Sequence, residues 1–401
     1  MFLGIYKMKK ILLGSEVITK YSKYKKVPAG IITTFATRVL NYSIFSPVVE
    51  HLLSHNFNIK KIFSAEHGYY LIKTAGENVT NIKDKYTNLP VYSLYGSTKE
   101  ILPQWVKDID IIFYDINDLG LRFYTFGSTL YYVLLSAKKL NKKVVILDRP
   151  NPLTAKIVDG NVLNKEYKSF VGISELPVRH GLTQGELALY YNSEENINAD
   201  LEVIPIENYD RNLWWDEIYP NVWFNPSPNI NSLTTALVYS GSCLFEGINV
   251  SYGTGTTRPF ELIGAPWINT QKWLDVLLSY KQYLNGVSFT KTVFVPKYGN
   301  YNNEVCYGLQ IVINNRNEVK MFNIATLMIS SLYETHKKNF KFIPTTNPQE
   351  KKKIYWIDKL AGGTELREFI KTKKISFAKL KTKWDTELDL FKRKRQKFLI
   401  Y

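Results

Sequence analysis

The stretch Asp108-Ile109-Asp110-Ile111-Ile112-Phe113-Tyr114-Asp115-Ile116 decides the expected fold, because its centre is continuously apolar. A strand that is covered on both faces of a parallel sheet is apolar throughout, whereas a half-exposed strand alternates apolar and polar residues. Strand-like runs also occur at residues 29–37, 59–64 and 142–148, with helical spacing between them, as at residues 128–141. This alternation predicts βαβ units and a parallel sheet, which is an α/β fold.

The local composition of the chain changes at residues 223–232, which are rich in proline and asparagine. Before this point, Thr183 and Glu186 have the spacing of a helix-capping box. Beyond it lie a Gly-rich aromatic stretch and then further helical and strand-like segments. A chain of 401 residues is long enough for roughly two domains. We expect two closely packed domains, residues 1–228 and residues 229–401.

The composition limits the partners and cofactors that we expect. The net charge of +16 favours anionic partners, although a biased genome would produce the same richness in lysine. The two cysteines have no metal-ligand spacing, so no metal site and no disulfide framework are expected. No apolar run approaches the roughly 20 residues of a membrane span. The N-terminus lacks the pattern of a cleaved signal peptide, which favours a cytoplasmic location.

Polar side chains follow the predicted strands at the positions where each strand ends. In an open parallel sheet, ligands bind beyond the carboxyl ends of the strands. One such end alone could be an ordinary turn, because Asp and Asn favour turns. Three ends together predict a cleft, and the side chains that they supply are Glu66, His67, Asp115, Asp118, Arg122, Asp148, Arg149 and Asn151.

A second group of polar residues lies near the expected domain boundary and comprises Arg179, His180, Asn225, Ser227, Asn229, Glu246, Asn249, Ser251, Arg258 and Glu261. The chain has no Walker A motif, no dinucleotide fingerprint and no G-x-S-x-G elbow. Carboxylates can supply the proton donor and the charge stabiliser of glycoside hydrolysis. Aromatic rings offer flat faces to sugars, and arginines hold acidic groups in a bidentate manner.

Several long motifs show a resemblance to a known family. They include "FSAEHG" at residues 63–68, "DIDIIFYDINDLGLRFYTF" at 108–126, "VVILDRPNPL" at 144–153 and "LFEGINVSYGTGTTRPFE" at 244–261. In these motifs the chain resembles the exo-β-N-acetylmuramidase family (NamZ-type), long known only as a domain of unknown function. The resemblance implies a Rossmann-like, mostly parallel N-terminal domain, a smaller α/β domain and a cleft between them.

The resemblance also implies an activity, which is release of N-acetylmuramic acid from the non-reducing end of peptidoglycan fragments. It implies muramyl sugars as partners, with neither nucleic acid nor a cofactor. Many relatives in the family are exported, which contrasts with the cytoplasmic location that the N-terminus favours. Two alternatives stay open. A related hexosaminidase of shifted specificity is suggested by Thr254, where the family typically has Arg. A non-catalytic binder of wall glycan is suggested by the positive charge.

The resemblance assigns roles by position. Glu66 becomes the candidate general acid, with His67 beside it, and Ala65 stands where the family usually has Pro. Asp115 and Asp118 are candidates for the second carboxylate, unless the substrate's own acetamido group attacks. The candidates for the lactyl group are Arg122, Arg179, His180 and Arg258. The other substrate-binding candidates are Tyr124, Arg149, Asn151, Asn229, Glu246 and Glu261.

Overall fold

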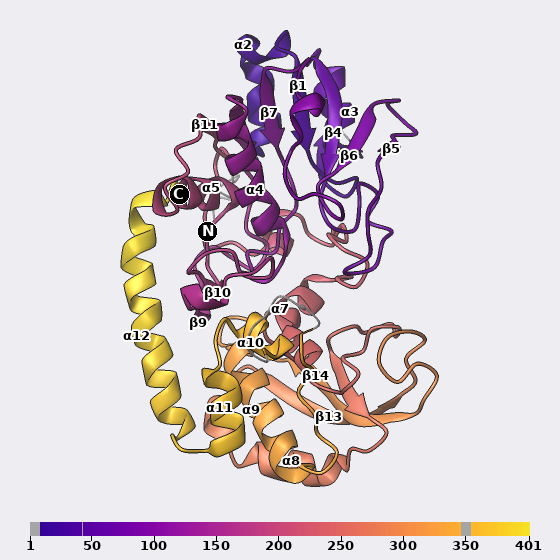
Figure 1. Cartoon of the computed structure of the whole chain (residues 1–401), viewed down its shortest axis with the longest axis vertical. Helices are drawn as coiled ribbons and strands as arrows, with labels where there is room; N and C mark the ends of the chain where they lie inside the picture. The colour runs from indigo at the N-terminus through magenta and orange to yellow at the C-terminus, as the bar shows by residue number, and fades with distance from the viewer. Residues whose placement is uncertain (1–8, 42, 346–353) are drawn as a thin grey trace, which may run out of the picture.

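The computed structural model describes residues 9–41, 43–345 and 354–401 of the chain. Its first domain is built on a seven-stranded sheet in which every neighbouring pair is parallel except the edge pair β5–β6 (Figure 1). In their order across the sheet, the strands are β11 (Leu201–Ile204), β8 (Lys143–Leu147), β7 (Ile111–Tyr114), β1 (Ala29–Ile32), β4 (Ile59–Ser64), β6 (Pro90–Ser93) and β5 (Ile82–Lys83). The expected α/β fold is confirmed.

Strand β7 is the apolar run that predicted this sheet, and every residue of the strand is buried. Ile112 and Tyr114 belong to the core that includes helix α4 (Phe126–Lys139) and helix α5 (Gln184–Glu194). Ile111 and Phe113 belong to the separate core on the other face, with helix α3 (Val48–Ser54). Successive side chains of a strand point to opposite faces, so a strand with helices on both sides needs apolar residues at every position.

Several short elements complete this half of the molecule. The helices are α1 (Gly14–Val17), α2 (Ser22–Lys25) and α6 (Trp215–Ile218). Two antiparallel pairs lie outside the main sheet, β2 (Arg38–Asn41) with β3 (Ile44–Pro47), and β9 (Asp159–Val162) with β10 (Pro177–Arg179). These pairs and strand β11 were not among the expected strands; in β11, Glu202 interrupts the apolar run.

The second domain contains a three-stranded antiparallel sheet, in the order β12 (Leu262–Ala265), β14 (Cys306–Ile313) and β13 (Val287–Phe294). Its helices are α7 (Leu233–Ser242), α8 (Thr270–Leu278), α9 (Met321–Thr335), α10 (Trp356–Ala361) and α11 (Glu365–Thr372). Figure 1 shows this domain below the first, in rose to orange. The division of the chain at residues 228 and 229 stays a prediction.

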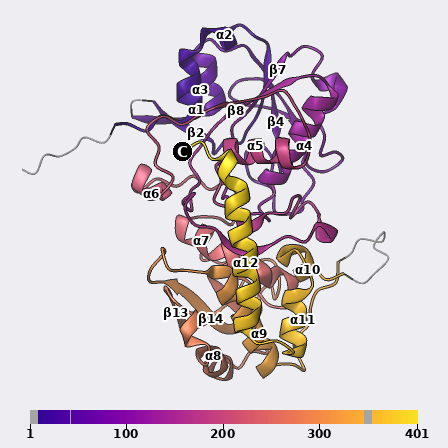
Figure 2. The ribbon, with the colours of Figure 1, turned by 90° about the vertical axis from the view of Figure 1, so that its left-hand side faces the viewer.

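Helix α12 (Phe377–Arg395) returns the chain from the second domain to the first, as the yellow helix in Figures 1 and 2 shows. The end of the chain then packs on the first domain, where Phe398 meets the ring of Tyr190 at 5.3 Å. The hydroxyl of Tyr401 donates to Asp148 Oδ2 at 2.8 Å and accepts from the Ile206 N–H at 2.7 Å. The last helix therefore ties the two domains together.

Candidate active site

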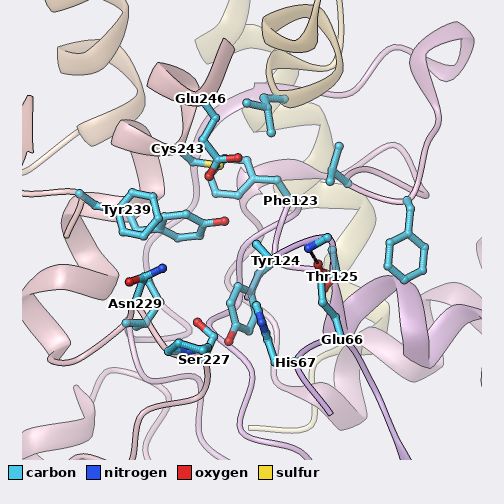
Figure 3. Close-up of a pocket in the computed structure, with 18 of the residues that line it drawn as sticks. Glu66, His67, Phe123, Tyr124, Thr125, Ser227, Asn229, Tyr239, Cys243 and Glu246 are labelled. Carbon is cyan, nitrogen blue, oxygen red and sulfur yellow. Dashed lines mark hydrogen bonds between the residues drawn. The ribbon is translucent and has the colours of Figure 1, made fainter. Parts of the chain in front are cut away.

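A cavity of about 400 Å³ lies between the two domains (Figure 3). A volume of this size is within the range of small-ligand pockets. The first domain contributes residues that follow strands β4, β6 and β7, and the second contributes helix α7 and the turn after it. The polar lining residues used below are Glu66, His67, Lys99, Tyr124, Thr125, Asn229, Tyr239, Cys243 and Glu246.

Glu66 stands on the turn that follows β4. His67 and Gly68 both have positive φ, of 69° and 77°, so the backbone leaves the strand direction at once. Glycine reaches this conformation at no steric cost, and the His67 Nδ1 contact with the Lys73 carbonyl at 2.9 Å helps to hold its neighbour there. Burial lowers the pKa of His67 below its usual 6.5, so its ring is neutral at pH 7.

Two donors fix the carboxyl group of Glu66. The Gly76 N–H donates to Oε1 at 2.9 Å, and the Thr125 hydroxyl donates to Oε2 at 2.5 Å. Figure 3 shows Glu66 and Thr125 joined at one side of the cavity. Thr125 directly precedes helix α4, so the same packing that positions this helix also sets the direction of the Glu66 side chain.

A second carboxyl group, Glu246, faces the same cavity from the turn after α7, with Cys243 beside it (Figure 3). Burial raises the pKa of Glu246 to about 7, and the charge of Glu66 adds to this effect. Glu246 therefore retains its proton in much of the protein near neutral pH. Glycoside hydrolysis uses two carboxyl groups in different environments, one as proton donor and one as carboxylate, and this cavity has two such groups.

Aromatic rings from both domains meet beside these carboxyl groups. Tyr239 contacts Phe123 edge-on at 5.3 Å and Phe260 at 4.6 Å. Tyr252 stacks on Phe260 at 5.6 Å. The rings hold one another in place by edge and face contacts, which leaves apolar surface next to the carboxyl groups. Such a wall suits the apolar face of a sugar ring.

Asp115 and Asp118 do not line this cavity, although both lie at the end of β7. Asp115 is buried and forms an ion pair with Arg149, which also donates to the Arg38 carbonyl at 3.0 Å. Asp118 Oδ1 accepts from the Gly120 N–H at 2.6 Å, and burial raises the pKa of Asp118 to about 7. In this structure these side chains stabilise the loops at the sheet edge, and their catalytic role stays a prediction.

The arginines expected to hold the lactyl group also lie outside the cavity lining. Arg122 is buried and donates to the carbonyls of Asn161 and Leu176 in the first domain and of Leu360 in the second. Arg179 is buried and donates to the Leu153 carbonyl. Backbone carbonyls accept hydrogen bonds from both guanidinium groups, although Arg122 Nε and Arg179 Nη1 are buried without a partner. Arg122 thus joins the domains rather than facing the cavity.

The remaining candidates outside the lining have structural partners as well. The Asn151 amide donates to the Leu182 carbonyl at 3.0 Å, and His180 Nδ1 accepts from the Leu182 N–H at 3.2 Å. Arg258 pairs with Glu261 at 3.0 Å. Thus the cavity brings together five of the candidates, which are Glu66, His67, Tyr124, Asn229 and Glu246.

Several lining residues are not among the candidates from the sequence, above all Lys99. Lys99 follows the end of β6, as Glu66 follows the end of β4. The same strand-end argument applied to "LPVYSLYG" and the residues beyond it would have found Lys99. Tyr239 and Cys243 carry no such signal, because they lie on an apolar helix and on the turn after it. Thr254, where the family typically has Arg, is buried and lies outside the lining.

Comparison with known proteins identifies the family. The model of the N-terminal domain of exo-beta-N-acetylmuramidase NamZ matches residues 30–234, and the model of its C-terminal domain matches residues 237–401. The chain belongs to the NamZ family. A NamZ relative, the peptidoglycan beta-N-acetylmuramidase of Bacillus subtilis (strain 168), is 36% identical over 385 residues, which cover 95% of this chain and 88% of the relative.

Two solved structures extend the NamZ comparison to the fold. Both are DUF1343 family proteins from Bacteroides fragilis NCTC 9343. One has a TM-score of 0.83 and 29% identity, and the other has a TM-score of 0.71 and 28% identity. Each match covers 98% of this chain and 99% of the other. The arrangement of both domains is therefore shared across nearly the whole length of these proteins.

Two further properties concern only the part of the chain that the structure describes. Within residues 9–41, 43–345 and 354–401, no helix has the length and apolarity needed to cross a membrane. The same residues contain no group of three His, Cys, Asp or Glu side chains arranged to hold a metal ion.

Proposed function

We propose that this chain is an exo-β-N-acetylmuramidase, a glycosidase that releases N-acetylmuramic acid from the non-reducing end of peptidoglycan fragments. The observation that carries the proposal is membership of the NamZ family over nearly the whole chain. The cavity supports it, because two carboxyl groups and an aromatic wall face a space suited to a single sugar unit.

In the proposed reaction, Glu66 protonates the glycosidic oxygen while the bond from that oxygen to the sugar's anomeric carbon breaks. In this proposal the second carboxyl group is that of Glu246, which lines the cavity, whereas the catalytic role expected of Asp115 or Asp118 stays a prediction. Glu246 stabilises the positive charge that develops on the sugar, either directly or by orienting the acetamido group. Water then adds to the anomeric carbon and completes the hydrolysis.

The reverse division of roles is a second candidate that one observation favours. Burial raises the pKa of Glu246 to about 7, so this group still holds a proton near neutral pH. Glu66 accepts hydrogen bonds from two donors, an arrangement that suits a carboxylate. Under this alternative, Glu246 donates the proton and Glu66 stabilises the charge.

The test uses two leaving groups. We expect the wild-type protein to release sugar from an N-acetylmuramyl-N-acetylglucosamine disaccharide and from a dinitrophenyl N-acetylmuramide. Loss of a general acid costs roughly 10²- to 10⁴-fold on the disaccharide. The loss is much smaller on the dinitrophenyl substrate, because dinitrophenolate departs without a proton. Glu66→Gln should show this pattern, and the same pattern in Glu246→Gln would reverse the roles.

The control is Glu304→Gln, which changes an exposed carboxyl group in the second domain and should leave both rates unchanged. A wild-type protein that releases no sugar from either substrate between pH 4 and pH 9 would overturn the proposed function. Faster hydrolysis of N-acetylglucosaminides than of muramides would indicate a hexosaminidase of shifted specificity. Binding of wall glycan without hydrolysis would indicate a non-catalytic binder.

A further inference from the structure

Lys99 is the one lysine or arginine among the described residues that line the cavity. It is partly buried, and its Nζ lies 4.0 Å from the centre of the Phe170 ring. Burial lowers the pKa of Lys99 and the charge of Glu66 opposes this effect, so the ammonium group is within electrostatic range of that carboxyl group. An ammonium group that leaves bulk water needs a compensating partner.

The described part of the chain supplies Lys99 with no hydrogen bond or ion pair. The nearest carboxylate in sequence, Glu100, instead pairs with Lys139 of helix α4 at 2.9 Å. Thr98 fixes this loop by bonding the N–H and the carbonyl of Glu100, each at 3.0 Å. Glu66 is held by Gly76 and Thr125. The ammonium group is therefore placed in the cavity by its loop but has no anion of the protein bound to it.

We propose that Lys99 is the specificity residue for the acidic substituent of the sugar, and that it pairs with the carboxylate of the 3-O-lactyl group. This inference rests on the proposed function, because the lactyl group distinguishes N-acetylmuramic acid from N-acetylglucosamine. The arginines expected to do this work are bonded to backbone carbonyls or to Glu261 outside the cavity lining. Lys99 supplies the positive charge that a carboxylate in the cavity would meet.

The test compares Lys99→Met with wild type on nitrophenyl N-acetylmuramide and nitrophenyl N-acetylglucosaminide, which lacks the lactyl group. Loss of one charge-assisted hydrogen bond lowers kcat/KM for the muramide by roughly 10- to 100-fold. This loss should lie mainly in KM, and the rate on the glucosaminide should not change. Lys99→Arg keeps the charge and should restore most of the preference. Lys139→Met removes an exposed lysine nearby and is the matched control.

Three results would overturn the inference. They are an equal loss on both sugars, a shift of both pH profiles by the same amount, and unchanged kinetics. The first two would mean that Lys99 acts through Glu66. Calorimetry with free N-acetylmuramic acid and free N-acetylglucosamine tests Lys99 without turnover. Wild type should prefer the acid, and Lys99→Met should lose that preference. An inactive wild type that still shows this difference in binding would overturn the proposed hydrolysis and keep the role of Lys99.

Discussion

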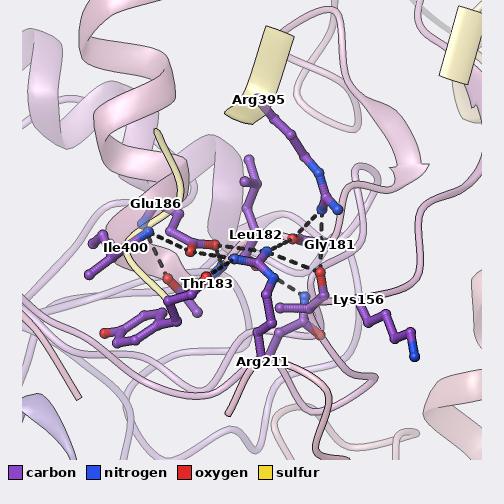
Figure 4. Close-up of polar contacts among 12 residues, drawn as sticks. Lys156, Gly181, Leu182, Thr183, Glu186, Arg211, Arg395 and Ile400 are labelled. Atoms are coloured by element: carbon purple, nitrogen blue, oxygen red, sulfur yellow. Dashed lines mark hydrogen bonds and ion pairs between the residues drawn. The ribbon is translucent and has the colours of Figure 1, made fainter. Parts of the chain in front are cut away.

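Glu186→Ala is expected to destabilise the first domain, because one buried carboxylate serves three partners there (Figure 4). The Thr183 N–H donates to Oε2 at 3.0 Å, which completes the cap of helix α5. Arg211 pairs with Oε1 at 3.0 Å, and the Ile400 N–H donates to Oε1 at 2.9 Å. The carboxylate therefore connects the start of a helix, a guanidinium charge and the end of the chain.

The expected loss follows from burial. The Glu186 side chain is 0% exposed and that of Arg211 is 15% exposed, so water screens this pair poorly. Removing one partner of a buried pair costs about 3–5 kcal/mol, because the other charge stays behind. Arg211 keeps the carbonyls of Gly181 at 2.9 Å and Tyr401 at 2.8 Å as acceptors, which favours the lower end, about 3 kcal/mol.

Urea unfolding followed by tryptophan fluorescence measures this loss as a change in the free energy of unfolding. Glu186→Gln, which keeps the shape and an acceptor, should lose about 1–2 kcal/mol. In a double-mutant cycle with Arg211→Ala, the combined loss should be smaller than the sum by at least about 1 kcal/mol. A Glu186→Ala protein within about 1 kcal/mol of wild type, together with additive losses in the cycle, would refute the reasoning.

Two further predictions concern stability. Tyr401→Phe removes a hydroxyl that bonds to Asp148 and Ile206, so unfolding should become easier by about 1–3 kcal/mol, with a lower Tm. An unchanged Tm would mean that these two hydrogen bonds do not stabilise the folded protein. Burial raises the pKa of Glu246 from 4.5 to about 7. The unfolded chain therefore releases this proton at lower pH than the folded protein, and stability falls as pH rises between those values. Glu246→Gln should flatten this part of the curve of unfolding free energy against pH, and an unaltered slope would contradict the assignment.

Much of the fold was predictable because local pattern and tertiary environment agree. The apolar run around β7 requires cover on both faces, and the structure supplies α3 on one side and α4 on the other. The capping box of Thr183 and Glu186 was readable from spacing and is present. The strands β11 and β12 were missed, because Glu202 and Gly264 interrupt their apolar runs, whereas the equally short β7 is apolar throughout.

The candidate site was only partly predictable. The strand-end rule selected Glu66 and His67, and both line the cavity because the turn with Gly68 follows β4 directly. The same rule also selected Asp115, which instead pairs with Arg149. A strand end determines where a residue stands but not which way its side chain points. Neighbouring charges and packing decide that direction.

The sequence by itself therefore determined the α/β architecture, the family and the position of Glu66. Only the tertiary structure decided that Glu246 supplies the second carboxyl group of the cavity lining and that Lys99 supplies a positively charged side chain there. Glu246 lies 180 residues from Glu66 in the chain, and the docking of one domain on the other brings them together. No local pattern encodes that contact, because it arises from the long-range packing that closes the cavity.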